Sequence, residues 1–110
     1  MEIATNRSKD VLIVAVSGRL DTVTAPEFEK KILELVTPEN LKIILNCADL
    51  SYISSSGLRV ILMTLKKVKA NNGKLIICGL QESIKEVFNI CGFTSLLTIS
   101  ENCESALSSF

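Results

Sequence analysis

Three consecutive serines followed by a glycine, at positions 54 to 57, are the residues of this 110-residue chain best suited to chemistry. They stand between an apolar segment and an amphipathic one, where a helix is expected to start. One serine at such a place acts as an N-cap, because its hydroxyl accepts a hydrogen bond from a free backbone N–H. Caps and turns alone would account for the cluster. Three serines in a row nevertheless leave at least one hydroxyl free to accept a phosphoryl group or to act as a nucleophile.

Catalysis by these serines has little support elsewhere in the chain. The sequence contains no histidine, the residue that most often activates a serine. Around Ser55 the G-x-S-x-G pattern is half met, since Ile53 stands in place of the first glycine. Asn72-Gly73-Lys74 lacks the upstream glycine and the following Ser or Thr of a phosphate-binding P-loop. A serine–lysine dyad stays open, but nothing places a lysine beside Ser55, and we expect no enzymatic activity.

A phosphate on one of these serines would be compatible with the fold. The first turn of a helix carries free N–H groups and the positive end of the helix dipole, which favour an anion. The phosphate would also bring a charge of roughly −1.5 to −2 to the surface, where Asp21 is expected in a neighbouring loop. At an effective dielectric constant of about 20, two unit charges about 6 Å apart repel each other by roughly 3 kcal/mol. Phosphorylation is therefore expected to weaken an interface at this spot while the domain stays folded.

The composition argues against several other classes of protein. The 12 basic and 12 acidic residues balance, whereas a nucleic-acid-binding protein would normally carry a basic excess. The four cysteines lack C-x-x-C spacing and have no histidine to complete a zinc site, so we expect no metal site, no disulfide framework and no cofactor. Each cysteine is expected to be a small buried apolar residue; they are Cys47, Cys78, Cys91 and Cys103.

The apolar segments are too short for export or membrane insertion. Residues 1–7 lack the apolar stretch of a secretory signal. The longest unbroken apolar run, residues 11–16, is far shorter than the roughly 20 residues that span a bilayer. We therefore expect a cytoplasmic protein that does not enter the membrane. Its length predicts a single domain over residues 1–110, most simply a monomer.

Alternating strands and helices are predicted to position the serines. Residues 3–7 and 11–16 are expected to be strands joined by a polar turn, which makes them an antiparallel hairpin. A helix follows, with Thr24 and Glu27 as a capping box, and Pro38 ends it. The remaining elements are, in order, a strand at 41–47, a helix after the serines that ends at Asn71-Asn72-Gly73, a strand at 75–78, a helix capped by Ser83 and Glu86 and ended by Gly92, a strand at 96–99 and a last short helix.

This order of elements predicts an α/β fold with a mixed, mostly parallel sheet of four to five strands, flanked by about four helices. Functional sites of such sheets lie beyond the carboxyl ends of the strands, so the loops at residues 18–23 and 51–57 should lie side by side. Val60 and Met63 fall off the buried stripe of the second helix. They either pack inside, under the third helix, or form an apolar patch beside the serines that suits a protein partner.

The serine cluster and its flanks are similar to a family signature in which a strand is followed by D-L-S, a few residues, D-S-[ST]-G-L and a helix. Residues 49–51 read D-L-S, and residues 54–58 read S-S-S-G-L. Residues 18–21, which read G-R-L-D, also match the family pattern after the second strand. With the opening hairpin and the alternating elements, essentially the whole chain resembles the STAS domains of bacterial anti-sigma factor antagonists.

The resemblance implies a STAS fold and a switch between partners. The unphosphorylated antagonist would bind an anti-sigma factor, a small ATP-using serine kinase, and so free a sigma factor. The kinase would then phosphorylate Ser55, the first serine of the S-[ST]-G motif, and a PP2C-type phosphatase would restore binding. The matching positions also imply a partner-binding surface, which comprises Gly18, Arg19, Asp21, Ser54, Ser56, Gly57 and Leu58.

One position departs from the family pattern. Ser54 stands where many members have aspartate, which leaves Ser54 and Ser56 as alternative phosphorylation sites. Two other functions also stay open: an adaptor of the same family that is never phosphorylated, and a module that binds a small ligand or nucleotide at the strand ends. The lack of a glycine-rich phosphate cradle counts against the second of these.

Overall fold

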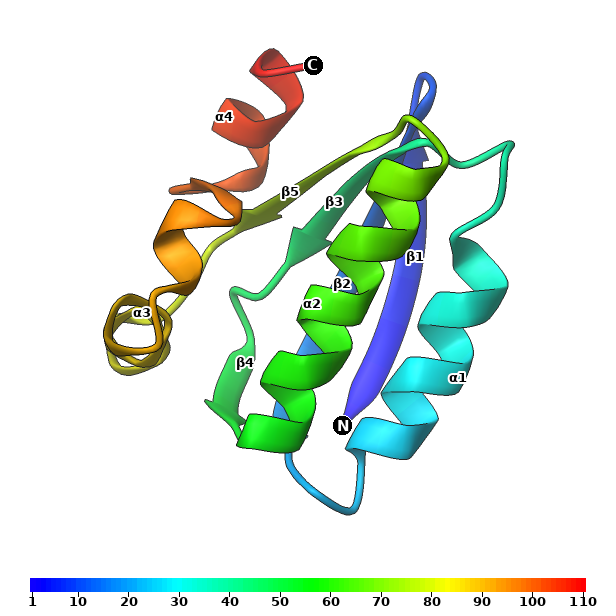
Figure 1. Cartoon of the computed structure of the whole chain (residues 1–110). Helices are drawn as coiled ribbons and strands as arrows, with labels where there is room; N and C mark the ends of the chain where they lie inside the picture. The colour runs from blue at the N-terminus through cyan, green and yellow to red at the C-terminus, as the bar shows by residue number, and fades with distance from the viewer.

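The computed structural model of the chain describes residues 1–110, and its first two strands form the predicted hairpin (Figure 1). β1 (Glu2–Ser8) and β2 (Val11–Leu20) are antiparallel along the whole length of β1. Lys9 in the turn takes the left-handed conformation, with a φ of 57°. β2 is longer than predicted, because its backbone stays extended past Gly18 instead of turning there.

The sheet is mixed, as predicted, and contains six strands rather than four or five. After the hairpin come β3 (Lys42–Asn46), β4 (Leu50–Ile53), β5 (Lys74–Cys78) and β6 (Thr98–Ser100). The order across the sheet is β1-β2-β3-β5-β6, and every neighbouring pair after the hairpin is parallel. β4, which was not predicted as a strand, pairs in parallel with the last residues of β2.

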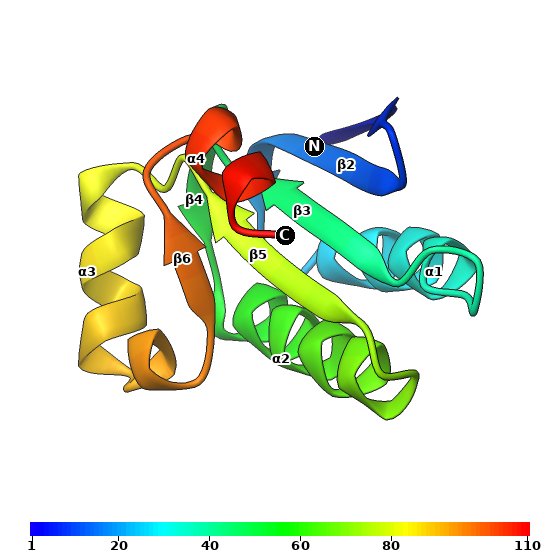
Figure 2. The ribbon, with the colours of Figure 1, turned by 90° about the horizontal axis from the view of Figure 1, so that it is seen from above.

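Four helices flank the sheet, in agreement with the prediction. They are α1 (Ala25–Leu35), α2 (Ser55–Ala70), α3 (Glu82–Ile90) and α4 (Cys103–Ser108), with a short 3₁₀ turn, η1 (Phe93–Ser95), after α3. Figure 2 shows α1 and α2 against one face of the sheet, α4 against the other, and α3 beside the edge strand β6. None of these helices has both the length and the apolar character needed to cross a membrane.

Two apolar cores lie on the two faces of the sheet. The larger one contains 23 buried residues and includes side chains of α1, α2 and α3, such as Phe28, Ile61 and Phe88. The smaller one contains five buried residues, among them Ile44 and Ala106, where α4 packs on β3 and β5. Because the central strands are covered on both faces, their sequences are almost continuously apolar.

The predicted C-terminal ends of α2 and α3 are confirmed. Asn72 follows α2 with a φ of 61°, and Gly92 follows α3 with a φ of 76°. Both take the left-handed conformation that commonly ends a helix. α1 ends at Leu35, before Pro38 as predicted.

The predicted capping boxes of α1 and α3 are not formed. Thr24 is the N-cap residue of α1, as predicted, but its hydroxyl makes no capping hydrogen bond and instead accepts a hydrogen bond from the backbone N–H of Asp21 at 2.9 Å. In α3, Gln81 occupies the N-cap position and its side chain makes no capping hydrogen bond, so Ser83 and Glu86 lie inside the helix. At α1 the Asp21 carboxylate accepts the Thr24 N–H at 3.0 Å, and at α3 the Gln81 side chain donates to the Ala48 carbonyl at 3.3 Å, so neither helix starts with a capping box.

Replacement of Phe28 by alanine tests the larger core. The Phe28 side chain is fully buried, and its removal should lower the free energy of unfolding by roughly 3–5 kcal/mol. Val23 offers a matched control, because it is 85% exposed and Val23→Ala should change stability by less than about 0.5 kcal/mol. Urea unfolding followed by circular dichroism measures both variants. Equal effects of the two substitutions would contradict this core.

Candidate functional site

Pairing between β2 and β4 brings together the two segments that were predicted to lie side by side, residues 18–23 and 51–57. The pairs are Gly18 with Leu50, Arg19 with Tyr52 and Leu20 with Ile53. Both segments are therefore partly strands rather than loops. Their predicted proximity is confirmed.

A bulge at Gly18 makes this pairing possible. The register shifts between Gly18 and Arg19, and Gly18 has a φ of 86°, a conformation that strains residues with a side chain. Two hydrogen bonds of 2.9 Å fix the irregular segment: the Gly18 N–H donates to the Asp49 carbonyl, and the Ser51 hydroxyl donates to the Gly18 carbonyl. β2 therefore pairs in parallel with β3 over residues 11–15 and with β4 over residues 18–20.

The three serines have different roles at the start of α2. Ser54 is the N-cap, and its hydroxyl oxygen accepts a hydrogen bond from the Gly57 N–H at 3.2 Å. β2 also holds Ser54, whose N–H donates to the Leu20 carbonyl at 2.8 Å. Ser55 is exposed and Ser56 is half-buried, and neither hydroxyl makes a hydrogen bond within the chain. Ser55 therefore carries the most accessible free hydroxyl of the cluster.

Gly57 determines how closely α2 approaches the strands. A Cβ atom at this position would lie 2.8 Å from Leu20 Cγ and 2.9 Å from Ile53 Cγ1, which is too close for carbon atoms. Leu58 is buried in the larger core and only 5% exposed. Gly57 and Leu58 thus pack the first turn of α2 against the sheet, and their contact with a partner stays a prediction.

Arg19, Tyr52 and Asp21 form the surface at the ends of β2 and β4. The Arg19 guanidinium carbon lies 4.1 Å from the centre of the Tyr52 ring, a cation–π contact, and Arg19 Nε is 3.9 Å from an Asp21 carboxylate oxygen. The Asp21 carboxylate also accepts hydrogen bonds from the N–H groups of Thr24 and Val23, each at 3.0 Å. These bonds, with that from Thr24 the strongest cause, lower the pKa of Asp21 below its ordinary value. Asp21 is therefore charged at neutral pH.

Three further residues of this region were not predicted as part of the site. Val23 and Tyr52 are 85% and 41% exposed, although both carry large apolar groups. Arg59 lies four residues after Ser55 on α2, and its Nη1 is 4.0 Å from Glu29 Oε1 on α1. The spacing from Ser55 could have identified Arg59, because residues four apart share one side of a helix. No comparable sequence signal existed for Tyr52, which is positioned by the unpredicted strand β4.

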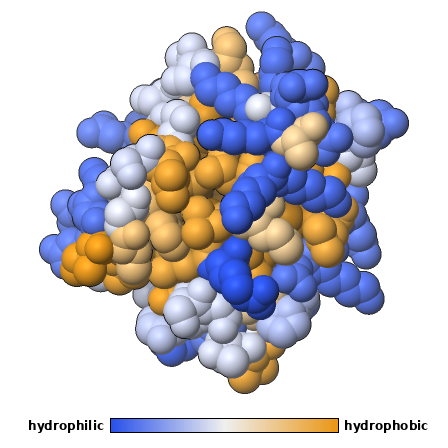
Figure 3. Space-filling view, in the orientation of Figure 1, coloured by the Kyte–Doolittle hydropathy of each residue, from blue (hydrophilic) through white to orange (hydrophobic).

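Val60 and Met63 belong mainly to the interior. Val60 is fully buried in the larger core, and Met63 is half-buried against it. Packing inside, one of the two predicted alternatives, is thus confirmed for Val60. The buried side of α2 is wider than one stripe because α1, β4 and β5 all contact this helix. Figure 3 shows apolar side chains gathered between α2 and α3 on the same face of the molecule.

The prediction that every cysteine is buried is wrong for two of them. Cys47 and Cys78 are buried, whereas Cys103 is half-buried and Cys91 is exposed. Cys91 follows the end of the short helix α3, where no element covers it. No group of three or more cysteine, aspartate or glutamate side chains is arranged to hold a metal ion.

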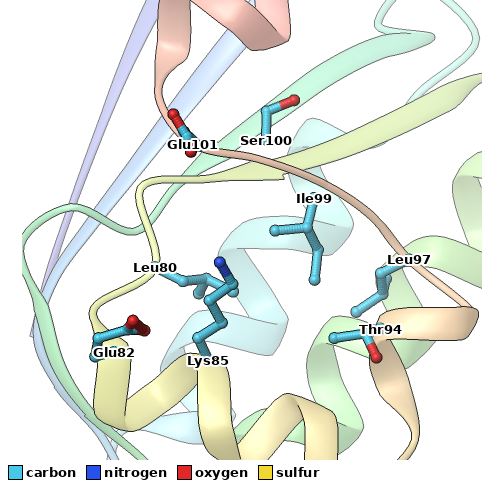
Figure 4. Close-up of a pocket in the computed structure, with 8 residues that line it drawn as sticks. All are labelled: Leu80, Glu82, Lys85, Thr94, Leu97, Ile99, Ser100 and Glu101. Carbon is cyan, nitrogen blue, oxygen red and sulfur yellow. The ribbon is translucent and has the colours of Figure 1, made fainter.

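The largest cavity lies away from the serines. It has a volume of about 500 Å³ and lies between α3 and β6 (Figure 4). The carboxylates of Glu82 and Glu101 line it together with the Lys85 amine. None of the predicted site residues contributes to its lining. Two carboxylates beside one amine would repel the phosphates of a nucleotide, so this cavity does not favour the nucleotide-binding alternative.

The sequence is similar to a protein family and to curated proteins. A family model described as the STAS domain matches residues 2–106. BtrV, a candidate anti-sigma factor antagonist of Bordetella bronchiseptica, is 30% identical over 110 residues, which cover 100% of this chain and 95% of BtrV. The anti-sigma-B factor antagonist of Staphylococcus epidermidis is 33% identical over 104 residues, which cover 94% of this chain and 96% of that protein.

Solved structures share the fold. A candidate anti-sigma factor antagonist from Thermotoga maritima matches with a TM-score of 0.92 and 21% identity, over 97% of this chain and 92% of that one. The Bacillus cell fate determinant SpoIIAA in its phosphorylated form matches with a TM-score of 0.75 and 20% identity, over 98% of both chains. These likenesses confirm the predicted fold class.

The different roles of Ser54 and Ser55 can be separated by stability measurements. Ser54→Ala removes the N-cap of α2 and should lower the free energy of unfolding by about 1 kcal/mol. Ser55→Ala should change it by less than about 0.5 kcal/mol, because the Ser55 hydroxyl makes no hydrogen bond within the chain. Urea unfolding compares the two variants. The opposite ranking would place the cap on Ser55 and contradict this assignment.

Proposed function

The chain belongs to the STAS domain family, and from that membership we propose that it is an anti-sigma factor antagonist. In the proposed switch, the unphosphorylated protein binds an anti-sigma factor and thereby frees a sigma factor. Phosphorylation of Ser55 ends this binding. The names of BtrV and of the staphylococcal relative support the proposal, since both are similar to this chain over nearly their whole length.

The observation that carries the proposal is the exposed, unbonded hydroxyl of Ser55 at the first residue of α2. Ser54 already caps the helix, so a phosphate on Ser55 removes no hydrogen bond from the fold. The free N–H groups and the dipole of the first turn favour the added anion. A phosphate on Ser55 would therefore alter the surface and preserve the folded domain.

The surface around Ser55 suits a protein partner that a phosphate would repel. Val23 and Tyr52 offer exposed apolar and aromatic groups, which are typical of the centre of an interface. The phosphate would add roughly −1.5 to −2 charges to a region that already contains the Asp21 carboxylate. A partner built to accept the unmodified surface would then face a strongly hydrated, like-charged group. The proposed contacts also include the predicted residues Gly18, Arg19, Ser54, Ser56, Gly57 and Leu58.

The proposed partners are a serine kinase and a phosphatase. We propose that the anti-sigma factor is itself the ATP-using kinase and that a PP2C-type phosphatase removes the phosphate. The chain has no histidine and no base hydrogen-bonded to Ser55, so the kinase has to supply both the catalytic base and the nucleotide. In this scheme Ser55 is a substrate, and the chain has no catalytic activity of its own.

Incubation with an anti-sigma factor kinase and ATP, followed by intact-mass measurement and phosphosite mapping, tests the switch. We expect one phosphate on Ser55 and none on Ser55→Ala, while the matched variant Ser56→Ala still accepts it. Ser55→Asp should bind the kinase about 100-fold more weakly than the unmodified protein, which corresponds to roughly 3 kcal/mol of charge repulsion. Isothermal titration calorimetry measures this difference.

Other outcomes of that experiment lead to different conclusions. A phosphate on Ser54 or Ser56 would move the site and keep the switch. No phosphate, with the kinase active on another substrate, would favour the unphosphorylated STAS adaptor. Unchanged binding of Ser55→Asp would contradict control by charge at this position. Stabilisation by nucleotides in a thermal-shift screen would revive the small-ligand alternative.

Arg59 is proposed to contact the phosphate once it has formed. Arg59 lies four residues after Ser55 on the same side of α2, and helical side chains lean toward the N-terminus, so its guanidinium can turn toward a phosphate on Ser55. Its present partner, Glu29, is 4.0 Å away, and the Arg59 side chain is 72% exposed. Such exposed pairs contribute little to stability, whereas a dianionic phosphate is a stronger partner for a guanidinium group. Arg59 can therefore leave Glu29 at small cost.

The second pKa of the phosphate reports this contact. It is about 6 for a free phosphoserine, and the Arg59 cation should hold it lower because it favours the dianion. Arg59→Ala should therefore raise that pKa by a few tenths, while Lys66→Ala, further along the same helix, should leave it unchanged. A phosphorus NMR titration of the phosphorylated variants measures both values. Equal pKa values in the two variants would exclude the contact.

A further inference from the structure

Two cysteines on the face of the sheet opposite α2 lie close enough to react with each other. Cys78 ends β5 and Cys103 begins α4, and their sulfur atoms are 3.5 Å apart. A disulfide needs a sulfur–sulfur distance of about 2.05 Å, so a shift of about 1.5 Å shared by two side chains closes the bond. We propose that Cys78 and Cys103 form a reversible intramolecular disulfide when the protein meets a peroxide, which makes the pair a redox modification site separate from Ser55.

The different burial of the two thiols determines which one reacts first. Cys103 is half-buried and reaches solvent, whereas Cys78 has no exposed surface. Burial raises the pKa of Cys78 to about 12, with further contributions from its hydrogen bond to Cys103 and from the Cys103 charge. Cys78 therefore stays a thiol at neutral pH, and the oxidant reacts first with Cys103.

The reaction balances with hydrogen peroxide as the oxidant. The Cys103 thiolate attacks one peroxide oxygen, the O–O bond breaks, and hydroxide leaves, which converts Cys103 to a sulfenic acid. The Cys78 sulfur then attacks the sulfenic sulfur, and the S–S bond forms as the S–O bond breaks and water leaves. In total, two thiols and one peroxide give one disulfide and two waters, and a thiol reductant reverses the reaction.

The other two cysteines are not placed to form this bond. Cys91 is exposed, but no other sulfur lies within hydrogen-bonding distance of it. Cys47 is fully buried, and burial followed by the Cys78 charge raises its pKa to about 12. Peroxide can therefore reach Cys91 without a second thiol to complete an intramolecular disulfide, and it cannot readily reach Cys47.

The disulfide would fasten α4 to the sheet. This helix packs on β3 and β5 through the smaller of the two cores. The new bond joins positions 25 apart in the chain, which restricts the unfolded state and so favours the folded one. Ser55 lies on α2, on the opposite face of the sheet (Figure 2). The oxidised protein therefore keeps the Ser55 hydroxyl accessible.

Peroxide treatment of the whole chain, followed by alkylation of the remaining thiols and digestion, tests the proposal. Trypsin cuts after Lys74 and thus separates Cys47 from Cys78, while glutamyl endopeptidase cuts after Glu101 and separates Cys91 from Cys103. We expect a cross-linked peptide pair that contains Cys78 and Cys103 and weighs about 2 Da less than the two free-thiol peptides together, because two hydrogens have been removed. The melting temperature should rise by about 5 °C or more and return to its starting value with dithiothreitol.

Single cysteine variants provide the controls. Cys91→Ser should keep both the cross-link and the thermal shift, whereas Cys103→Ser should lose both. Cys103→Ser carries the test because a half-buried position tolerates serine, while a substitution at buried Cys78 also disturbs the core. The proposal is overturned if Cys78 is still fully alkylated after oxidation and unfolding, with Cys103 converted to higher oxides. Cross-links formed only between chains through Cys91 would overturn it as well.

Discussion

The parallel pairing of β4 with the last residues of β2 is the interaction on which the functional surface depends. The bulge at Gly18 lets β2 exchange β3 for β4, and the Leu20 carbonyl then accepts the N–H of Ser54. The start of α2 is thus attached to the sheet through backbone groups. Ser55 needs no hydrogen bond of its own to hold its position, and its hydroxyl stays free while its backbone is fixed.

Ser54 explains how the chain departs from the family signature without losing the local structure. Aspartate and serine are both strong N-caps, so serine at this position keeps the hydrogen bond to the Gly57 N–H. It does so without a negative charge beside Ser55. The proposed phosphate on Ser55 would therefore be the first negative charge at the start of α2 rather than an addition to one already present at position 54.

Sequence patterns predicted the elements that have a strong local signal, namely the hairpin, the helices and the proximity of the segments that carry the site. β4 has no such signal, because Leu50–Ile53 is only four residues long and its two middle residues are exposed. The contact between Cys78 and Cys103 depends on where α4 packs on the sheet. Such features arise from contacts between elements, which residue spacing alone does not contain.

The same β2–β4 contact determines how late in folding the surroundings of Ser55 are completed. It joins residues as far as 33 positions apart, Ser51 and Gly18 among them, and contacts of such separation form slowly because a long loop has to close first. The residues around Ser55 reach their folded arrangement only after this closure. In the proposed switch, a kinase that recognises this arrangement would phosphorylate folded molecules and not nascent or partly unfolded ones. The phosphorylated fraction would then measure the supply of functional antagonist rather than the total amount synthesised.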